Sequence, residues 1–518
     1  MTAQLITTGR TVLVLLLLVL TAPGMKGRAQ SSSSAAANSS PETRVLQMEP
    51  YTEEEIEQVV QRPLKLEDCI RIAMRKNLQL MMEEYGLRMT VADLSGSYAR
   101  FFPQFAVDGV MQKAEENRPF EAKNPEDPTR LTYDKNAIVA KVQQDFITGA
   151  TLTFAADLRR DINSPDRFGA PPTRTENRGY SITLEQPLLR DAWFTIAKSP
   201  ITLARQEMEI RESEFYDMKL RTVFDVKQAY YNVILQRELM KVTEAALVRD
   251  STLVRLSESK VRVNLATRRD VLSAQIRFAE DRAAYIAAQT EYERALDNLK
   301  DVLGLPIEME ISLEDVQLGY SPEPLDEEFL IRHALENNPL IKSLKKSIEN
   351  LQLRHKVAKN MLLPQLNLVM QYNGQFDSDR DQLKTIESND FQVGLSLSYP
   401  FLNRQAAAEA EKARLALRQQ ELRLLDYQRQ LKLSIREVVR ATYSNIEEIE
   451  ALKISIEAAQ EKVEFATMMF NLGRASNLDV TDAQEALLKA QTQYLKKLID
   501  YHLQLALLET LIAQPIVF

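Results

Sequence analysis

The sequence has few of the residues from which catalytic and metal sites are usually built. Its 518 residues include one cysteine, Cys69, and three histidines, His333, His355 and His502. One cysteine cannot form an intramolecular disulfide, and the histidines lie far apart and fit no metal-ligand spacing. The motifs GxxxxGK[ST] and GxSxG do not occur. We therefore expect that the chain is not an enzyme and that it needs neither a metal nor a cofactor.

Glycine is also scarce, with 14 residues, which is less than half of average usage. This favours long helices over glycine-rich loops. The apolar fraction of 45% and the charged fraction of 27% predict a folded protein. The formal net charge is −8, so the chain is a poor candidate for binding nucleic acid.

The N-terminus has the layout of an export signal. Arg10 precedes an apolar run at 12–20, and small residues follow. Residues 1–29 are therefore predicted to be a signal peptide, although cleavage after Ala22 fits as well. The serine-rich stretch that follows predicts a flexible linker over 30–63. Beyond it, no stretch reaches 18 apolar residues without a charge.

The chain contains two related halves. The segment around Asn77 returns around Asn338, 261 residues later, and the Pro-Gln pair after Phe102 returns after Leu363 at the same offset. Two further matches follow in the same order, at smaller offsets: Pro187 with Pro400 (213) and Asp270 with Asp479 (209). Ordered matches of this kind indicate an internal duplication. The predicted domains are a first repeat at 64–306, an inter-repeat linker at 307–324 and a second repeat at 325–518.

The changes in offset locate the differences between the repeats. The first repeat has 48 extra residues between Pro103 and Pro187. It has four more between Pro187 and Asp270. Four residues are close to one helical turn, so the second difference predicts one long helix in both repeats with nearly the same buried face.

Each repeat is predicted to begin with a helix and to continue into strands. The helices at 66–101 and 327–362 are expected to end before Pro103 and Pro364, since proline disfavours helix in the preceding residue. Apolar and polar residues then alternate, most clearly at 391–399, which predicts strands with one apolar face. Similar alternation occurs at 180–185, at 366–372 and, within the 48 extra residues, at 138–146 and 150–158. This last pair predicts an added hairpin around Thr148-Gly149, followed by a polar surface loop at 161–178.

A very long helix follows in each repeat, at about 201–261 and 404–471, without internal proline or glycine. Apolar residues recur in it every seven positions, which predicts packing against other helices. The heptad residues are Val226, Val233, Met240 and Leu247 in the first repeat and Leu417, Leu424, Leu431 and Val438 in the second.

Both long helices are followed by the same sequence pattern, a tight turn and a helix-capping motif. Thr267 with Asp270, and Ser476 with Asp479, have the spacing of capping boxes. They predict new helices at 267–303 and 476–513 after a tight turn, and Gly473 lies in the second turn. Each repeat is therefore expected to end in a helical hairpin with a defined tip.

Four features together resemble the TolC-like outer-membrane efflux protein family, also called outer membrane factors. They are the helix-to-strand pattern, present twice as Ala-x-x-x-Asn followed by Pro-Gln; Gln186-Pro187-Leu188; GRASNLDVTDAQ at 473–484; and the duplication with such long helices. The resemblance spans about 64–513. It implies a mainly α fold with a membrane β-barrel: the long helical hairpins form a periplasmic α-barrel, and the strands contribute to an outer-membrane β-barrel shared by three chains.

The resemblance also implies a function and partners. The expected function is that of the outer-membrane channel of a tripartite efflux pump or a type I secretion system. It would be a passive exit duct, gated at its periplasmic end. The expected partners are two more copies in a homotrimer, outer-membrane lipid, a periplasmic adaptor and an inner-membrane pump. The tip turns at 262–269 and 471–478 would meet the adaptor. The 48 extra residues depart from the simplest family pattern of two strands per half, and would either enlarge the barrel or form an outer lid.

The residues assigned by the resemblance fall into three groups. The periplasmic aperture would contain Asp479, Asp482, Phe470 and Arg474. The helix-tip turns and their capping would use Thr267, Asp270, Gly473 and Ser476. The helix–strand junctions would lie at Pro103, Pro187, Pro364 and Pro400. Cys69 is expected in a helix interior and Trp193 packed at a strand-to-helix junction.

Two other interpretations compete with the channel. The heptads alone fit an exported periplasmic coiled-coil scaffold without a pore, in which the strands would pack on a dry core. The regular alternation at 391–399, with Gln, Gly and Ser on the second face, argues against that scaffold. An exported enzyme is the third interpretation, and no catalytic motif supports it.

Overall fold

The computed structural model describes residues 50–117, 130–165, 173–263, 267–315, 318–320, 324–379 and 384–514. All elements described here belong to the compact unit Gln47–Phe518. The predicted signal peptide and residues 30–49 of the predicted linker lie outside the described residues.

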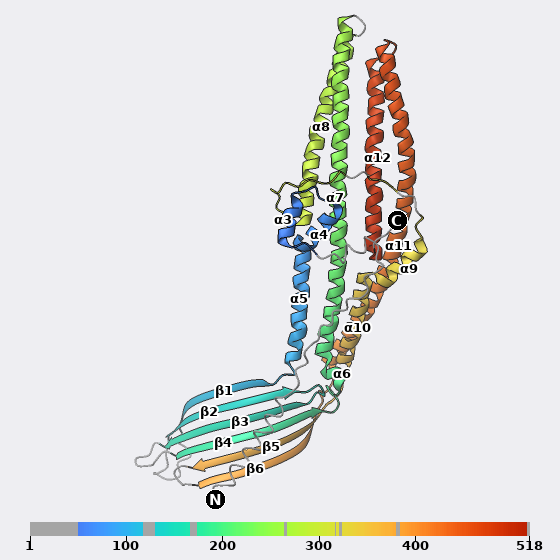
Figure 1. Cartoon of the computed structure of the whole chain (residues 1–518). Coiled ribbons are helices and arrows are strands. Elements are labelled where there is room, and N and C mark those ends of the chain that lie inside the picture. The colour runs from blue at the N-terminus through green and yellow to red at the C-terminus, as the bar shows by residue number, and fades with distance from the viewer. Residues whose placement is uncertain are drawn as a thin grey trace. The chain divides into compact units, whose positions relative to one another are not determined.

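Helices dominate the described chain, and a six-stranded sheet interrupts them twice (Figure 1). Helix α3 (Glu53–Val60) precedes the repeats. The first repeat contains α4 (Leu66–Lys76), α5 (Leu78–Ala99), β1 (Gln104–Asn117), β2 (Arg130–Asp145), β3 (Thr151–Pro165), β4 (Thr173–Pro187), α6 (Phe194–Ala197), α7 (Ser199–Arg262) and α8 (Arg268–Leu303). The second contains α9 (Glu327–Asn337), α10 (Pro339–Asn360), β5 (Gln365–Asp379), β6 (Lys384–Ser398), α11 (Arg404–Asn471) and α12 (Asn477–Ile512).

The predicted long helices and the helices that follow them are confirmed within two residues. The position of the four-residue difference is a correction. Helix α7 has 64 residues and α11 has 68, so the first repeat is shorter, not longer, within the helix. Its extra residues lie instead between Pro187 and Ser199, where the short α6 is added. The extra residues are accommodated at this strand-to-helix junction, because the long helices must keep their packing register with each other.

The predicted linker at 30–63 is also corrected. Residues 53–60 form α3, which begins with a complete capping box between Thr52 and Glu55. Ile56 and Val60 are buried, so this helix packs on the rest of the chain. The predicted loop at 161–178 is shorter as well, because β3 extends to Pro165 and β4 begins at Thr173.

The helices predicted at 66–101 and 327–362 are each broken at an asparagine. The Asn77 side chain caps α5 by accepting from the Leu80 backbone N–H at 2.9 Å, and it donates to the Val302 carbonyl at the end of α8 at 2.8 Å. Asn338 does the same in the second repeat. It caps α10 and donates to the Leu511 carbonyl at 3.2 Å. The breaks therefore tie the first helices of each repeat to the end of its last helix.

We expect Asn338→Ala to destabilise the protein by about 2 kcal/mol, because it removes a helix cap and a buried hydrogen bond. The neighbouring Asn337→Ala is the matched control, since that side chain bonds only within its own helix, to His333. Thermal unfolding followed by circular dichroism measures both. Equal shifts in the two variants would contradict the role of Asn338.

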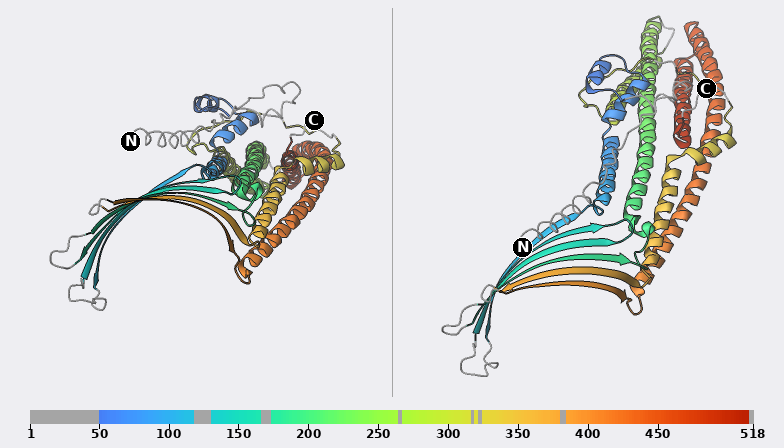
Figure 2. Two further views of the ribbon diagram at one scale, coloured as in Figure 1. Left: turned by 90° about the horizontal axis from the view of Figure 1, so that it is seen from below. Right: turned by 60° about the horizontal axis from the view of Figure 1, so that its bottom comes forward.

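The packing of the helices is organised around α7. Helix α7 packs against α5 and α10 along one part of its length and against α8 and α12 along the other, while α11 packs against α10 and α12 (Figures 1 and 2). The heptad prediction holds at its centre, because Val226, Val233, Leu431 and Val438 are all buried. At one outer edge of this arrangement lie α5, near the sheet, and α8, towards the tips; α11 lies at the other edge (Figure 1).

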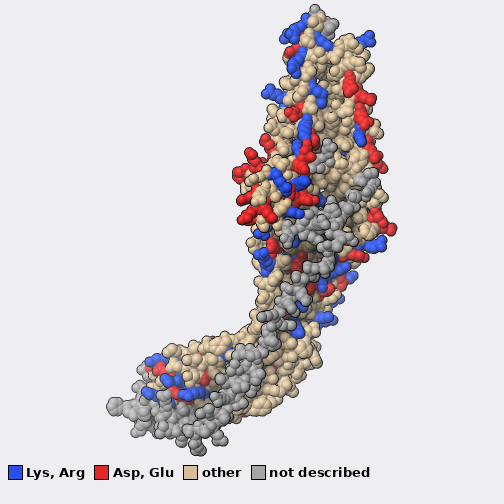
Figure 3. All heavy atoms as spheres, viewed as in Figure 1, with Lys and Arg blue, Asp and Glu red and all other residues tan. Residues whose placement is uncertain are grey.

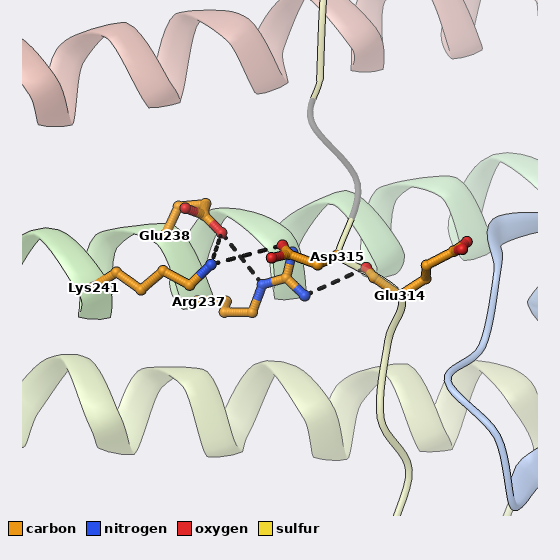
Figure 4. A network of polar contacts seen from close by, with 5 residues as sticks. All are labelled: Arg237, Glu238, Lys241, Glu314 and Asp315. Atoms are coloured by element: carbon orange, nitrogen blue, oxygen red, sulfur yellow. Dashed lines mark hydrogen bonds and ion pairs between the residues drawn. The ribbon is translucent and has the colours of Figure 1, made fainter.

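The segment between the repeats is fixed to the middle of α7. Leu64 and Leu313 form a parallel bridge. Arg237 donates to Asp315 Oδ1 at 2.8 Å and to the Glu314 carbonyl at 3.4 Å, and its Nε lies 3.3 Å from Glu238 Oε1 (Figure 4). Residues 312–315 are therefore bonded in place, although they fall within the predicted linker.

The sheet is an antiparallel meander in the order β1-β2-β3-β4-β5-β6. Its strands curve along their length (Figure 2). The added hairpin, β2 and β3, is confirmed, and Gly149 in its turn has φ +89°. A Cβ there would lie 2.7 Å from the Asp191 carbonyl, so glycine is required at this turn.

On the visible face, Lys, Arg, Asp and Glu gather over the helices, whereas most of the described sheet surface is uncharged (Figure 3). Within the described residues, no helix combines the length and the apolar character needed to cross a bilayer.

Candidate functional site at the helix tips

The two helical hairpins, α7–α8 and α11–α12, end in tips built in the same way. At the first tip, Asp270 N–H donates to Thr267 Oγ1 at 3.3 Å, and Asp270 Oδ2 accepts from the Thr267 N–H at 2.8 Å. At the second tip, the equivalent distances between Asp479 and Ser476 are 3.3 and 2.7 Å. Both predicted capping boxes are therefore present in the structure.

These hydrogen bonds fix the charge of both carboxylates. Donation from the Thr267 side chain and backbone lowers the pKa of Asp270, and donation from Ser476 lowers the pKa of Asp479. Both side chains therefore remain ionised through the neutral range. Asp482 lies one turn further along α12 and is exposed, as is Arg474 in the turn.

The turn between α11 and α12 depends on a left-handed glycine. Gly473 has φ +71° and donates its N–H to the Phe470 carbonyl at 3.0 Å. A Cβ at this position would meet open space, so the conformation itself, rather than crowding, favours glycine.

Phe470, which the resemblance assigns to the periplasmic aperture, is buried in the single chain, with only 3% of its surface exposed. It belongs to a core cluster at the tips formed by both hairpins: Leu253, Ala274, Ala466, Phe470, Val480 and Ala483. Its side chain packs between the two hairpins of one chain.

Two residues that the sequence analysis missed complete this contact. The ammonium group of Lys260 in α7 lies 3.7 Å from the centroid of the Phe470 ring and donates to the Phe470 carbonyl. Lys260 is 8% exposed, and this burial lowers the pKa of its ammonium group. Asn477, which is 1% exposed, donates to the Asp270 carbonyl at 3.0 Å. We call Lys260–Phe470 and Asn477–Asp270 the tip latch.

A sequence signal for Lys260 did exist. The offset of 209 aligns Lys260 with Met469 and Ser257 with Ala466, so the first repeat has polar residues where the second has less polar ones. A buried cation such as Lys260 needs a hydrogen-bond acceptor nearby. The free carbonyl groups at the C-terminal end of α11 provide it.

The junction prolines lie where predicted. Pro103 and Pro364 directly precede β1 and β5, Pro187 is the last residue of β4, and Pro400 follows β6 by two residues. The junctions of the two repeats are also bonded to each other, because Leu188 N–H donates to the Leu366 carbonyl at 2.8 Å.

Large apolar side chains are exposed at these same junctions. Phe102 is 64% exposed, Phe401 is 93% exposed, and Trp193 is 73% exposed with φ +76°. The prediction that Trp193 packs at its junction is therefore wrong. An exposed aromatic set at the ends of strands is typical of the level at which a protein meets the membrane interface. Cys69, in contrast, is buried as expected.

The fold and the tips define a class of protein: a duplicated chain whose long helical hairpins continue from a curved antiparallel sheet, as in outer-membrane channels. The model of a family described as "Outer membrane efflux protein" matches residues 151–305 and 330–514. The chain belongs to this family. It is an outer-membrane channel protein of the kind that serves efflux or type I secretion, with a large periplasmic part.

Individual proteins agree with this assignment. The chain is 24% identical over 346 residues to the alkaline protease secretion protein AprF of Pseudomonas aeruginosa, covering 63% of this chain and 68% of that protein. It is 21% identical to the outer membrane protein TolC of Vibrio cholerae, covering 71% and 85%. The CmeC outer-membrane channel of Campylobacter jejuni has a similar fold, with a TM-score of 0.65, 14% identity and coverage of 93% and 90%.

Proposed function

We propose that three copies of this chain form one continuous exit duct, which is closed at the helix tips until a periplasmic adaptor and an inner-membrane pump engage it. The observation that carries the proposal is that the sheet and the helices have the same two open edges. Strand β1 leads from α5, and strand β6 leads into α11. Both outer strands and both outer helices thus present an edge to a neighbouring copy.

The helical edges carry matching apolar stripes. On α5, four residues at heptad-like spacing are more than half exposed: Leu78, Met82, Tyr85 and Met89. On α11, Leu415, Leu422 and Leu433 lie on one face and are also more than half exposed. An α5 stripe that packs on the α11 stripe of the next copy forms a head-to-tail contact, which closes into a ring.

The sheet edges support the same contact. Strands β1 and β6 run in opposite directions because the meander has an even number of antiparallel strands. Strand β6 of one copy can therefore pair with β1 of the next and continue the antiparallel pattern. A closed ring leaves no strand edge unpaired, which a membrane requires.

We expect Met82→Arg to prevent assembly, because it places a charge at the centre of the α5 stripe. Ser95→Arg is the control, since Ser95 is exposed on the same helix but lies off the stripe. The mass of detergent-extracted particles, with electron microscopy of their symmetry, measures the outcome. A wild-type particle of one chain, or without three-fold symmetry, would contradict the trimer.

The tip latch is proposed to hold the duct closed. Removing the buried Lys260 hydrogen bond costs about 2 kcal/mol, which is about a thirty-fold change in the ratio of open to closed states. We therefore expect Lys260→Ala with Asn477→Ala to raise the conductance of single channels in planar bilayers. Arg255→Ala is the control, because Arg255 is exposed and bonds only to Ser251 of its own helix. Unchanged conductance in the double variant would exclude the latch from gating.

Asp482 is proposed to form an acidic ring at the mouth of the trimer. Asp479 lies behind it in the capping box, and Arg474 is proposed to lie beside the ring. Asp482 tests the ring separately from the cap, because the capping box uses Asp479. The same recordings on an Asp482→Asn channel are expected to show weaker preference for cations over anions. An unaltered preference would assign Asp482 to the solvated helix surface alone.

A further inference from the structure

The added hairpin β2–β3 continues both faces of the sheet without interruption. One row of side chains crosses all six strands and is apolar throughout: Phe105, Val142, Phe154, Ile182, Tyr372 and Phe391. The adjacent row, on the opposite face, is polar throughout: Gln104, Gln143, Thr153, Thr183, Gln371 and Gln392. Two added strands that formed a separate lid would not need to continue these apolar and polar rows.

The pairing of the hairpin is as complete as that of the other strands. Strand β2 pairs with β1 along all fourteen residues of β1, from Gln104 to Asn117, and β3 pairs with β4 from Thr151 to Asn163. Strands β1 and β4, which would be neighbours in the simpler pattern of two strands per repeat, are thereby separated by two full strands. The hairpin is therefore an integral part of the six-stranded sheet.

We propose that each chain contributes six strands to the membrane wall, so that the trimer closes an eighteen-stranded barrel with its polar row facing a wide aqueous bore. This inference rests on the proposed trimer. With strands about 4.8 Å apart and tilted by about 40°, eighteen strands give a backbone diameter of about 36 Å, and twelve strands give about 24 Å.

The wider bore changes the class of cargo that the outer-membrane part admits. Side chains occupy about 5 Å on each side, half of the spacing between packed sheets, which leaves about 26 Å for eighteen strands and about 14 Å for twelve. Two packed helices are about 20 Å across. The eighteen-stranded barrel therefore admits a polypeptide that retains paired helices, and a twelve-stranded one does not.

Distances between spin labels test the strand number directly. The label is placed at Ile182→Cys, on the apolar row, in a Cys69→Ala background so that the chain has one cysteine. Three equivalent labels, each about 5 Å outside the backbone ring, give one distance, about 40 Å for eighteen strands and about 29 Å for twelve. Pulsed electron paramagnetic resonance on the detergent-extracted full chain measures it.

The matched variant lacks residues 123–170. Removing these 48 residues, an even number, joins β1 to β4 through a short loop and keeps every remaining side chain on its face of the sheet. We expect about 40 Å in the full chain and about 29 Å in the shortened one. A distance of about 29 Å in the full chain would place the hairpin outside the wall and overturn the inference.

The two proposals fail in different ways. The particle mass of the labelled sample reports the trimer independently of the distance, so a different mass contradicts the proposed assembly. A trimeric mass with the shorter distance contradicts only the eighteen strands. If the shortened chain does not assemble, the distance in the full chain still decides between the two values.

Discussion

Gly304→Ala is expected to cost on the order of 3 kcal/mol in the free energy of unfolding, as the sum of a left-handed residue and a backbone collision. Gly304 ends α8 with φ +69°. A Cβ added there would lie 2.2 Å from the Lys76 carbonyl oxygen, directly before the helix break at Asn77. Neither the end of α8 nor the start of α5 can move freely, because Asn77 bonds them together.

The second repeat offers the matched control. Ala513 ends α12 at the equivalent position, 209 residues later, and has φ +55°. It already has the Cβ that Gly304 lacks. Ala513→Gly is expected to change stability by less than about 1 kcal/mol, since relief of the left-handed strain is offset by a more flexible unfolded chain. Thermal unfolding of the two variants, followed by circular dichroism at 222 nm, measures both changes in stability. Similar losses in both would show that the approach to Lys76 has no part in the effect.

The stability of the first hairpin is expected to fall as the pH rises from about 4 to about 7. Asp250 in α7 is 3% exposed and faces Asp281 in α8, which is 7% exposed. Burial, and then the neighbouring Asp281 carboxyl, raise the pKa of Asp250 from 3.8 to about 7. In this interval the folded state binds more protons than the unfolded state, so the free energy of unfolding decreases with pH.

The expected size of this effect is on the order of a few kcal/mol, because each unit by which folding raises the pKa of Asp250 contributes about 1.36 kcal/mol. Arg277 lies 3.5 Å from Asp281 and 3.9 Å from Asp250. Its positive charge offsets part of the free-energy cost of ionising these buried carboxyl groups. In the second repeat, the positions equivalent to Asp250 and Asp281, 209 residues later, are the buried and uncharged Ala459 and Ala490.

Asp250→Asn removes the titration and nearly keeps the shape. We expect the wild-type unfolding temperature to be higher at pH 5 than at pH 8, and the difference to shrink in Asp250→Asn. The comparison is made within one pair of proteins, so other titrating groups cancel. If both proteins showed the same dependence on pH, the Asp250–Asp281 contact would not be its source.

Much of this architecture was predictable because its signals are local. The capping boxes at Thr267 and Ser476 need only two residues three positions apart, and the long helices need only the absence of proline and glycine. The duplication then allowed one repeat to check the other. Family resemblance supplied what no local pattern contains, namely the expectation that several chains close into one duct.

The features that escaped prediction depend on contacts between distant segments. Asn77 interrupts a helix only because the end of α8 offers a carbonyl to its side chain. Phe470 is buried because the other hairpin brings Leu253, Ala274 and Lys260 against it. The place of the β2–β3 hairpin in the sheet depends on its register with β1 and β4, which alternation within one strand cannot give.

The insertion of a whole hairpin has an evolutionary consequence. Each described helix that adjoins the sheet does so at the same end, and the described strands of each repeat are even in number, four in the first and two in the second. A single added strand would place the following helix at the opposite end of the sheet. In the proposed barrel, the number of strands can therefore change only in steps of two per chain, and each step leaves the helical half of the molecule unchanged.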